Sequence, residues 1–224
     1  MNIYFIRHGH PDYDTDSLTE LGHKQAELLS ERVKDFPIEK IYHSPMGRAR
    51  QTAEHCNKYF NFKMTELPFL REIEWGDLSG NAYDTDGPWD ITERLIKNEH
   101  RYPEGDSWKT LPEISHDRLV DDIERKIGLF DDFLADCGFV REGQLYRITK
   151  ENKSNIAFFC HGGITSALVS HMINIPFWTF IAHFPIEMTG ITKLCISGSE
   201  GSYAAAEVDY LNSYIHLGTT MLNG

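Results

Sequence analysis

Cysteine is scarce in this sequence, and no cysteine is spaced as in a disulfide or metal framework. The four cysteines, Cys56, Cys137, Cys160 and Cys195, are scattered over 224 residues and form no CxxC pair. Disulfide scaffolds and zinc sites depend on dense or closely paired cysteines. We therefore interpret these residues as free thiols in a reducing compartment.

Long apolar runs are missing too. No apolar stretch approaches the roughly 18 residues that suggest a membrane span, and Asn2 and Arg7 bracket only a short apolar segment at the N-terminus. A secretory leader would carry a longer apolar segment after a basic start. We expect a cytoplasmic protein without a membrane partner.

Positive charge is in deficit. Lys and Arg number 22 against 34 Asp and Glu, which leaves a formal net charge of −12. Nucleic acids and anionic membranes are bound largely through basic patches, so this balance argues against both as partners. Any phosphate pocket in this chain has to concentrate its positive charge locally.

Two common catalytic motifs are absent as well. The sequence has no Walker-type glycine-rich loop, which disfavours nucleotide hydrolysis, and no HExxH or other short histidine spacing typical of zinc sites. We predict that the protein uses no metal and no cofactor. One alternative stays open from the residues alone, a metal bound by His8, His161 and Glu72.

The patterns that are present predict an α/β fold. With 41% apolar residues, the chain is long enough for one domain with a sizeable core. Buried strands are expected at residues 3–6, 40–43, 156–160 and 191–196. Helices are expected after an N-cap at Thr19, from Ser44-Pro45, over 117–134, and from 164 to about 173. This alternation favours a mostly parallel sheet covered on both faces.

Two segments lack such periodicity. Residues 80–106 are polar and aromatic, and residues 138–155 are polar and charged. Long irregular segments in compact domains are often functional, so we interpret both as excursions from the core layers that cover a site. The aromatic side chains of the first segment could stack on a sugar or base, or form the small core of the excursion itself. We favour the second interpretation.

Two of the expected strands are followed by the same pair of residues, a histidine and a glycine. Arg7-His8-Gly9 follows the first strand, and His161-Gly162-Gly163 follows the strand at 156–160. Ligands of open α/β sheets bind where such strands end, and a neutral imidazole there can attack a bound anion. Cys160 occupies an apolar strand position, so we interpret it as a core residue rather than a nucleophile.

Two further segments contribute candidate site residues. Arg48 lies in about the first turn of the helix expected from Ser44-Pro45, where the dipole disfavours a cation by a few tenths of a kcal/mol, so a bound anion is indicated. Glu72 and Glu74 compete as a proton donor flanked by apolar groups, and their spacing does not choose between them. Imidazoles, guanidiniums, helix N-termini and a carboxylic acid together favour phosphoryl transfer through a phosphohistidine.

These motifs resemble those of the histidine phosphatase superfamily, the phosphoglycerate mutase-like group. The resemblance covers nearly the whole chain in the expected order, from Arg7-His8-Gly9 and the 18–26 stretch through 44–53 and 70–72 to His161-Gly162-Gly163. It implies a three-layer α/β/α sandwich with a mostly parallel central sheet. Residues 1–224 would form a single domain, with residues from about 80 to 155 inserted as a cap.

The resemblance also implies roles for individual residues. His8 would be the nucleophile, and Glu72 would protonate the leaving oxygen and then activate water, which chooses Glu72 over Glu74 by analogy. Arg7, Arg48 and His161 would hold the phosphate oxygens. Gly9, the amide of Gly162, and Ser107 in a Gly-acid-Ser turn at 105–107 would complete the phosphate and substrate contacts.

Two positions depart from the family pattern. Many members carry a hydroxyl residue and an Asn where this chain has Pro11 and Asp14. Phosphoglycerate mutases keep this stretch closely, so the departure favours hydrolysis of a small phosphorylated metabolite. Mutase-type phosphoryl transfer and a catalytically weak protein that binds phosphorylated ligands remain the alternatives.

Overall fold

The computed structural model describes residues 1–218, and its centre is a six-stranded sheet. Across the sheet the strands are β11 (Glu207–Ser213), β9 (Ile191–Cys195), β1 (Asn2–Arg7), β8 (Asn155–Cys160), β4 (Lys40–His43) and β5 (Thr65–Glu66). β1, β8, β4 and β5 are parallel, whereas β9 pairs antiparallel with both β1 and β11. The prediction of a mostly parallel sheet is confirmed.

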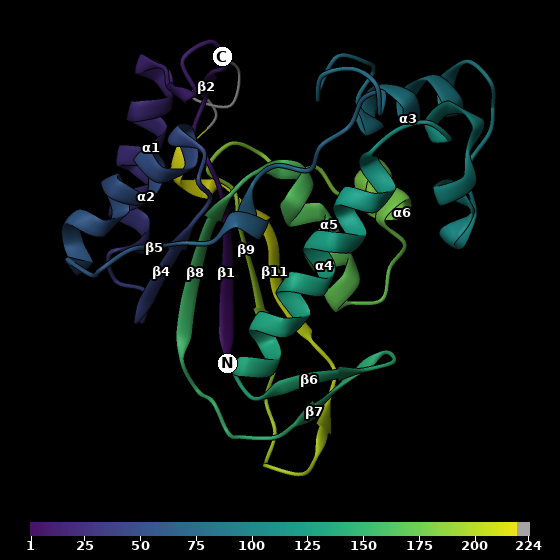
Figure 1. Ribbon diagram of the computed structural model, residues 1–224. Helices are drawn as coiled ribbons and strands as arrows, with labels where there is room; N and C mark the ends of the chain where they lie inside the picture. The colour runs from purple at the N-terminus through teal and green to yellow at the C-terminus, as the bar shows by residue number, and fades with distance from the viewer. Residues whose placement is uncertain (219–224) are drawn as a thin grey trace.

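Alternating residues of the central strands face two helical layers. Tyr4 and Ile6 lie in a core cluster with Leu29 and Val33 of α1 (Glu20–Val33) and with Ala53 of α2 (Gly47–Phe60). Figure 1 shows α1 and α2 together on one side of the sheet. Successive strand side chains point to opposite faces, so the continuous apolar run of β1 packs against both helical layers.

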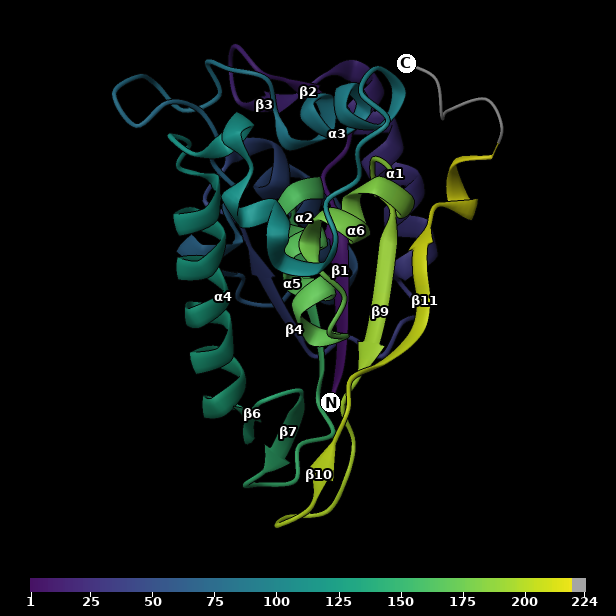
Figure 2. The same ribbon diagram turned by 90° about the vertical axis from the view of Figure 1, so that its right-hand side faces the viewer.

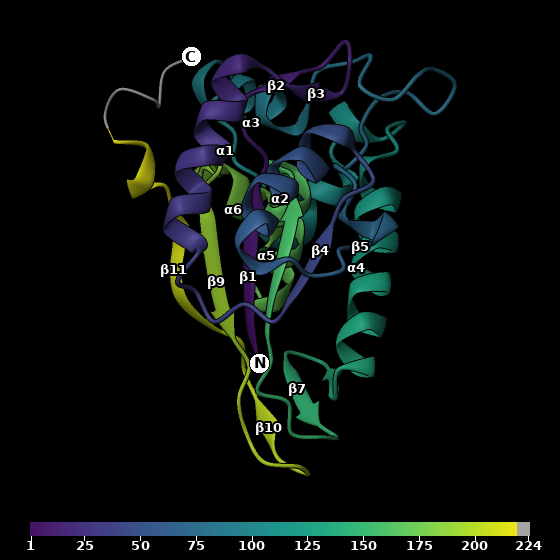
Figure 3. The same ribbon diagram turned by 90° about the vertical axis from the view of Figure 1, so that its left-hand side faces the viewer.

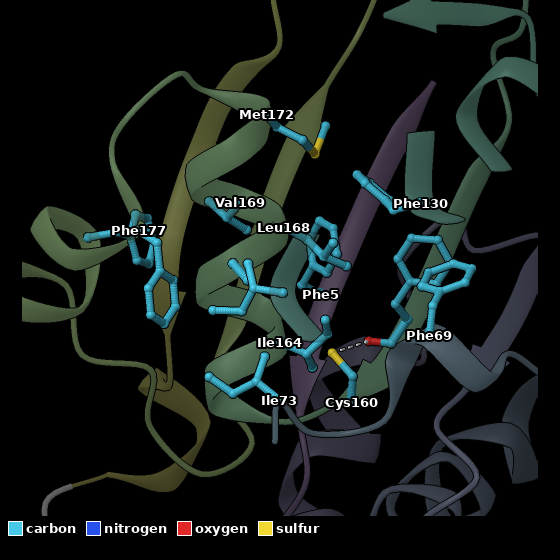
Figure 4. Close-up of a cluster of buried hydrophobic side chains, with 14 of the residues drawn as sticks. Phe5, Phe69, Ile73, Phe130, Cys160, Ile164, Leu168, Val169, Met172 and Phe177 are labelled. Atoms are coloured by element: carbon cyan, nitrogen blue, oxygen red, sulfur yellow. Dashed lines mark hydrogen bonds between the residues drawn. The ribbon is translucent and has the colours of Figure 1, made fainter. Parts of the chain in front are cut away.

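The other face carries α4 (Leu119–Asp136) and α5 (Gly162–Met172). Phe5, Phe130 and Leu168 belong to the core cluster between these helices and the sheet, and Figure 4 shows Phe5 and Phe130 close to Phe69. Helices on both faces make the three-layer α/β/α sandwich that the resemblance implied.

The expected strands and most helix starts agree with the structure. Thr19 is the N-cap of α1, and its side chain accepts a hydrogen bond from the Gly22 amide at 3.1 Å. The start expected for α2 is wrong: the N-cap is Met46 rather than Ser44, and the helix begins at Gly47. Ser44 instead contacts a histidine of the site described below.

Residues 80–155 divide between three places. α3 (Pro88–Lys97) lies near the end of the sheet where β1 finishes. Two 3₁₀ segments follow, η2 (Gly105–Thr110) and η3 (Pro112–Ile114), and η2 shares a hollow with His171 near the end of α5. α4 packs along the sheet itself. The range 138–155 was expected to be irregular, but it contains a hairpin. β6 (Phe139–Glu142) pairs with β7 (Leu145–Ile148), which also pairs with β10 (Tyr203–Ala204).

The two ends of the molecule therefore differ. Figure 2 shows the hairpin of β2 (Pro11–Asp12) and β3 (Ser17–Leu18) and α3 at one end, and Figure 3 shows β7 and β10 at the other. α6 (Phe177–His183), the 3₁₀ turn η1 (Pro68–Leu70) and the 3₁₀ turn η4 (Ile215–Leu217) complete the elements. Within residues 1–218 no helix is long and apolar enough to cross a membrane.

Candidate active site

The two histidines of the duplicated strand-end motif face each other. β1 and β8 are adjacent and parallel, so His8 and His161 leave the sheet side by side. Their ring centroids lie 5.0 Å apart with an interplanar angle of 61°, and both side chains are buried. Parallel pairing of the two strands therefore brings residues 153 positions apart in the sequence to one point.

The hydrogen bonds of His8 leave one nitrogen available as a nucleophile. Its Nδ1 lies 2.7 Å from the Gly9 carbonyl oxygen, which places the ring proton on Nδ1. Its Nε2 accepts from Nε of Arg48 at 3.2 Å. Burial, together with the guanidiniums of Arg7 and Arg48, holds the pKa of His8 well below its usual value. The ring is therefore neutral at physiological pH.

His161 is held in the same neutral form. Burial, followed by the nearby His8 and Arg48, lowers its pKa well below 6.5. Its Nε2 lies 2.8 Å from the Ser44 hydroxyl oxygen. Nδ1 is buried and has no hydrogen-bond partner within residues 1–218.

Arg7 supplies positive charge beside the histidines. Its Nη1 donates to the Ile186 carbonyl, and its buried Nε has no hydrogen-bond partner in the described part of the chain. A Cβ built on Gly162 would lie 3.4 Å from that Nε, so the backbone of Gly162 is close to the guanidinium.

Arg48 is buried in the first turn of α2, where it is paired with an acid that the sequence analysis did not select. Nη1 of Arg48 and the Asp16 carboxylate are 2.5 Å apart, and the other Asp16 oxygen accepts from the Gly47 amide at 2.7 Å. The Asp16 backbone has φ of +50°. The acid of this hairpin that reaches the site is therefore Asp16, whereas Asp14 is exposed and its amide donates to Asp12.

Glu72 sits at the N-terminus of α5. Its carboxylate accepts from the amides of Ile73 at 2.9 Å, Ile164 at 2.8 Å and Gly163 at 3.2 Å. A Cβ on Gly163 would lie 2.7 Å from the Glu72 carboxylate and 2.5 Å from Ile73, so only glycine permits this approach. Glu74 points elsewhere: its carboxylate lies 3.6 Å from Nε of Arg71.

A buried ion pair supports the loop that carries Glu72. Nζ of Lys126, 1% exposed, donates to the Glu72 carbonyl and to the Asp122 carboxylate, both at 2.6 Å. Asp122 in turn accepts from the Glu74 amide at 2.8 Å. Burial lowers the pKa of Lys126, although Asp122 opposes that shift. Two side chains of α4 thus fix the backbone on both sides of residue 73.

Part of this set lines one cavity of about 820 Å³, whereas His161 is fully buried behind it and is not part of the lining. Arg7, His8, Arg48, Glu72 and Gly162 form one part of its wall. Aromatic side chains form another part, and they are Tyr13, Trp75, Tyr83 and Trp89. The aromatic residues in and beside the 80–106 segment therefore divide, since Tyr83 and Trp89 reach the cavity but Trp108 is buried against Phe177 and Trp178.

Not every predicted contact residue reaches the cavity. Ser107 is an exposed residue of η2 and is not part of the lining. Gly9 is buried, with its amide donating to Thr52 at 3.1 Å and its carbonyl bound to His8, so its contacts orient the nucleophile. Pro11 lies in the β2–β3 hairpin.

Cys160 is a core residue. It is fully buried, its Sγ lies 3.2 Å from the Thr165 hydroxyl oxygen, and burial raises the pKa of its thiol to about 12. Figure 4 shows it among apolar side chains such as Ile164. Within residues 1–218, no group of three or more His, Cys, Asp or Glu side chains is arranged to hold a metal ion. His8, His161 and Glu72 therefore do not form such a group.

Sequence reasoning missed Ser44 and Asp16 as parts of the site. Ser44 was read as a helix cap, and its position after β4, next to β8 in the sheet, is what brings it to His161. Asp16 is separated from Arg48 by 32 positions, and only the close approach of the β2–β3 hairpin to α2 joins them. No local sequence signal identifies either contact.

Comparison with known proteins gives a consistent match. The profile of the histidine phosphatase superfamily (branch 1) matches residues 3–123. A Bacillus subtilis protein named uncharacterized phosphatase PhoE is 30% identical over 129 residues, which are 53% of this chain and 60% of that protein. A Yersinia pestis protein named probable phosphoglycerate mutase GpmB is 30% identical over 141 residues, 57% of this chain and 66% of that protein.

The matched regions therefore span less than two thirds of the length of these curated relatives. Solved structures resemble the fold over almost the whole chain. A mycobacterial glucosyl-3-phosphoglycerate phosphatase has a TM-score of 0.65 at 22% identity, covering 95% of this chain and 98% of its own. A phosphoserine phosphatase from Entamoeba histolytica has a TM-score of 0.62 at 18% identity, covering 96% and 98%.

Proposed function

The chain belongs to the histidine phosphatase superfamily, and on this premise we propose that it hydrolyses small phosphomonoesters through a phosphohistidine at His8. The observation that carries the proposal is the pair of neutral, buried imidazoles 5.0 Å apart with Arg7 and Arg48 beside them. The relative named phosphatase PhoE supports hydrolysis, the relative named probable phosphoglycerate mutase GpmB corresponds to the mutase alternative, and the two phosphatase structures share the fold.

The phosphate-binding groups are the donors that lie beside His8 in the cavity. A phosphoryl group bound at His8 would accept from Nε of Arg7, from the Gly162 amide and from Arg48. For His8 to attack, Arg48 has to exchange its bond to Nε2 of His8 for a bond to a phosphate oxygen. The guanidiniums then stabilise charge on the transferring group.

Each step conserves protons. Nε2 of His8 forms a bond to phosphorus while the bond from phosphorus to the ester oxygen breaks, and protonated Glu72 gives its proton to that oxygen. Water then attacks the phosphohistidine, and the Glu72 carboxylate takes the proton of the water. The bond from Nε2 to phosphorus breaks, which releases inorganic phosphate and neutral His8.

We further propose that the chain is one domain in which residues 80–118 act as the cap. α4 and the β6–β7 hairpin lie outside this cap because α4 packs on the sheet and the hairpin lies at the opposite end. The prediction of a domain over 1–224 extends to residues 219–224, which lie outside the described residues. A cytoplasmic location and the absence of nucleic-acid partners stay predictions from composition.

The decisive experiment traps the intermediate. After brief mixing with a ³²P-labelled phosphomonoester, the wild-type protein is expected to carry a covalent phosphoryl label that is labile in acid. His8→Ala is expected to carry no label and to lose at least about 1,000-fold in kcat/KM. Free phosphate as the product supports hydrolysis, whereas an isomeric phosphomonoester supports the mutase reading. Undiminished turnover by His8→Ala contradicts the proposal.

A further inference from the structure

We propose that the natural substrate is the phosphomonoester of an uncharged, ring-bearing alcohol, whose ring packs on Trp75, Tyr83 and Trp89. This inference rests on the proposed function and adds the class of the leaving group. We call these three residues the aromatic wall. They line the same cavity as His8, so a molecule with its phosphate at His8 extends toward them.

The aromatic wall is a built surface with free ring area. The Trp75 and Tyr83 centroids lie 4.6 Å apart at 75°, and those of Trp75 and Trp89 lie 5.7 Å apart at 82°. The Trp75 indole donates to the Thr85 carbonyl at 3.2 Å. Tyr83 and Trp89 each remain 37% exposed. Edge-to-face contacts hold the rings, while ring area still faces the cavity.

The backbone at the wall is also unusual. Tyr83 has φ of +71°, a conformation that bulky residues seldom adopt, and its amide is held by the Trp75 carbonyl at 2.8 Å. Non-glycine residues in this region cluster at ligand-binding segments. The strain is consistent with a ring that is positioned for a ligand.

The size of the cavity exceeds what a phosphoryl group needs. At about 820 Å³, it lies in the range of roughly 300–1,000 Å³ that is typical of sites for ligands of drug size. Met46, Ile181 and Ile186 add further apolar lining. An alcohol of several carbons is therefore the better match than a two- or three-carbon acid.

The charges argue for an uncharged leaving group. Beyond the cations assigned to the phosphate, the cationic side chain in the lining is Arg71, and it faces Glu74 at 3.6 Å. Glu187 adds an acid to the same lining, and the charge of Asp16 is already paired with Arg48. Beyond the cations assigned to the phosphate, a substrate carboxylate would therefore meet Glu187 and one cation that is already paired, which disfavours carboxylated phosphomonoesters.

The test compares substrates whose leaving groups are matched in chemistry. 2-Phenylethyl phosphate and ethyl phosphate both release a primary alcohol, so their difference reports the ring rather than leaving-group acidity. We expect kcat/KM for 2-phenylethyl phosphate to exceed that for ethyl phosphate by about tenfold or more. We expect 3-phosphoglycerate to be the poorest of the three.

Variants connect this preference to the wall. Tyr83→Leu and Trp89→Leu are each expected to lower the ratio of the two kcat/KM values by about fivefold. Tyr102→Leu is the matched control, because Tyr102 lies in the same segment, is 40% exposed and is not part of the cavity lining. It should leave the ratio unchanged.

Binding measurements test this inference separately from the proposed hydrolysis. Calorimetry with 2-phenylethylphosphonate and ethylphosphonate, which cannot be hydrolysed, should show the same preference in the wild type and its loss in Tyr83→Leu. Equal affinities, or tighter binding of 3-phosphoglycerate, overturn the inference. Preferential binding without turnover of any phosphomonoester leaves the substrate-binding inference standing and contradicts the proposed hydrolysis instead.

Discussion

At the scale of single residues, the site depends on two imidazoles that the fold keeps neutral. His8 and His161 both have a pKa well below 6.5, chiefly because they are buried, and Arg7 and Arg48 reinforce the shift. A neutral ring carries the lone pair that a nucleophile needs. Burial and the neighbouring cations keep the two rings neutral, so the free energy of unfolding is expected to fall in acid.

This neutrality predicts how stability depends on pH. The lowered pKa values mean that below pH 6.5 the unfolded chain binds protons that the native histidines do not, so the free energy of unfolding falls as the pH falls below 6.5. For His161 the slope is up to about 1.4 kcal/mol per pH unit. Urea unfolding of wild type and His161→Gln between pH 7.5 and 5 measures it. Parallel curves for the two proteins contradict the assignment.

Asp16 carries a second prediction, because its carboxylate occupies donors that a phosphate would use. It binds Nη1 of Arg48 and the Gly47 amide. Asp16→Asn removes the negative charge while it keeps an acceptor, so inorganic phosphate should inhibit about fivefold more strongly. Asp14→Asn is the control, since Asp14 is exposed and does not line the cavity. Unchanged or weaker inhibition in Asp16→Asn would show that the carboxylate chiefly orients Arg48.

At the scale of elements, α4 and α5 together place Glu72. The N-terminus of α5 supplies the amides of Gly163 and Ile164, while Lys126 and Asp122 of α4 bind the backbone on the other side. An acid on a loop without regular structure thus acquires the rigidity of two helices. This arrangement makes α4 part of the site although no side chain of α4 lines the cavity.

The ion pair of α4 predicts a large difference between two neighbouring cations. Lys126→Met leaves Asp122 buried without its main partner, so the free energy of unfolding should fall by about 3 kcal/mol or more. Arg125→Met removes a cation that is 59% exposed and contacts the same Asp122, and it should cost less than about 1 kcal/mol. Chemical denaturation of the two variants measures both values. Equal losses would contradict the importance of the buried pair.

At the scale of the whole molecule, the cavity joins the sheet to the segments beyond it. Its lining includes His8 at the end of β1, Arg48 of α2, Trp89 of α3 and Ile181 of α6. A ligand that contacts all of these binds the native state and not the unfolded chain. Binding therefore adds directly to global stability.

Inorganic phosphate is accordingly expected to raise Tm. At 100 times its Kd it should add about 2.7 kcal/mol to the free energy of unfolding. Differential scanning calorimetry in phosphate and in sodium chloride of equal ionic strength measures the specific part. Arg48→Ala should respond to phosphate no more than to chloride. A phosphate effect that survives in Arg48→Ala would place the anion elsewhere on the molecule.

How far the sequence predicted this molecule depends on the range of the interactions involved. The α/β class, the strands that became β1, β4, β8 and β9, and the Thr19 cap follow from local patterns and are confirmed. Arg7, His8, Arg48 and His161 could be selected because strand ends and helix starts are marked locally. The roles assigned to them stay predictions.

Other features needed the folded chain. The hairpin at 139–148 and helix α3 were not predicted, because polar and turn residues dominate the segments around them; α3 nevertheless buries Ile91, Thr92 and Leu95 on one face, and β7 alternates buried and more exposed residues. Ser44 contacts His161 across the sheet, and Asp16 contacts Arg48 across the β2–β3 hairpin. Such pairings depend on strand order and loop path, which local spacing does not encode.

Which chemical groups stand at the strand ends follows from the amino-acid sequence alone, because apolar runs and the turn residues after them are local properties of the chain. Only the tertiary structure decided which of those groups meet, which acid pairs with Arg48, and that Tyr83 and Trp89 share a cavity with His8. The physical reason is that parallel strand pairing and helix packing set distances between residues far apart in the sequence.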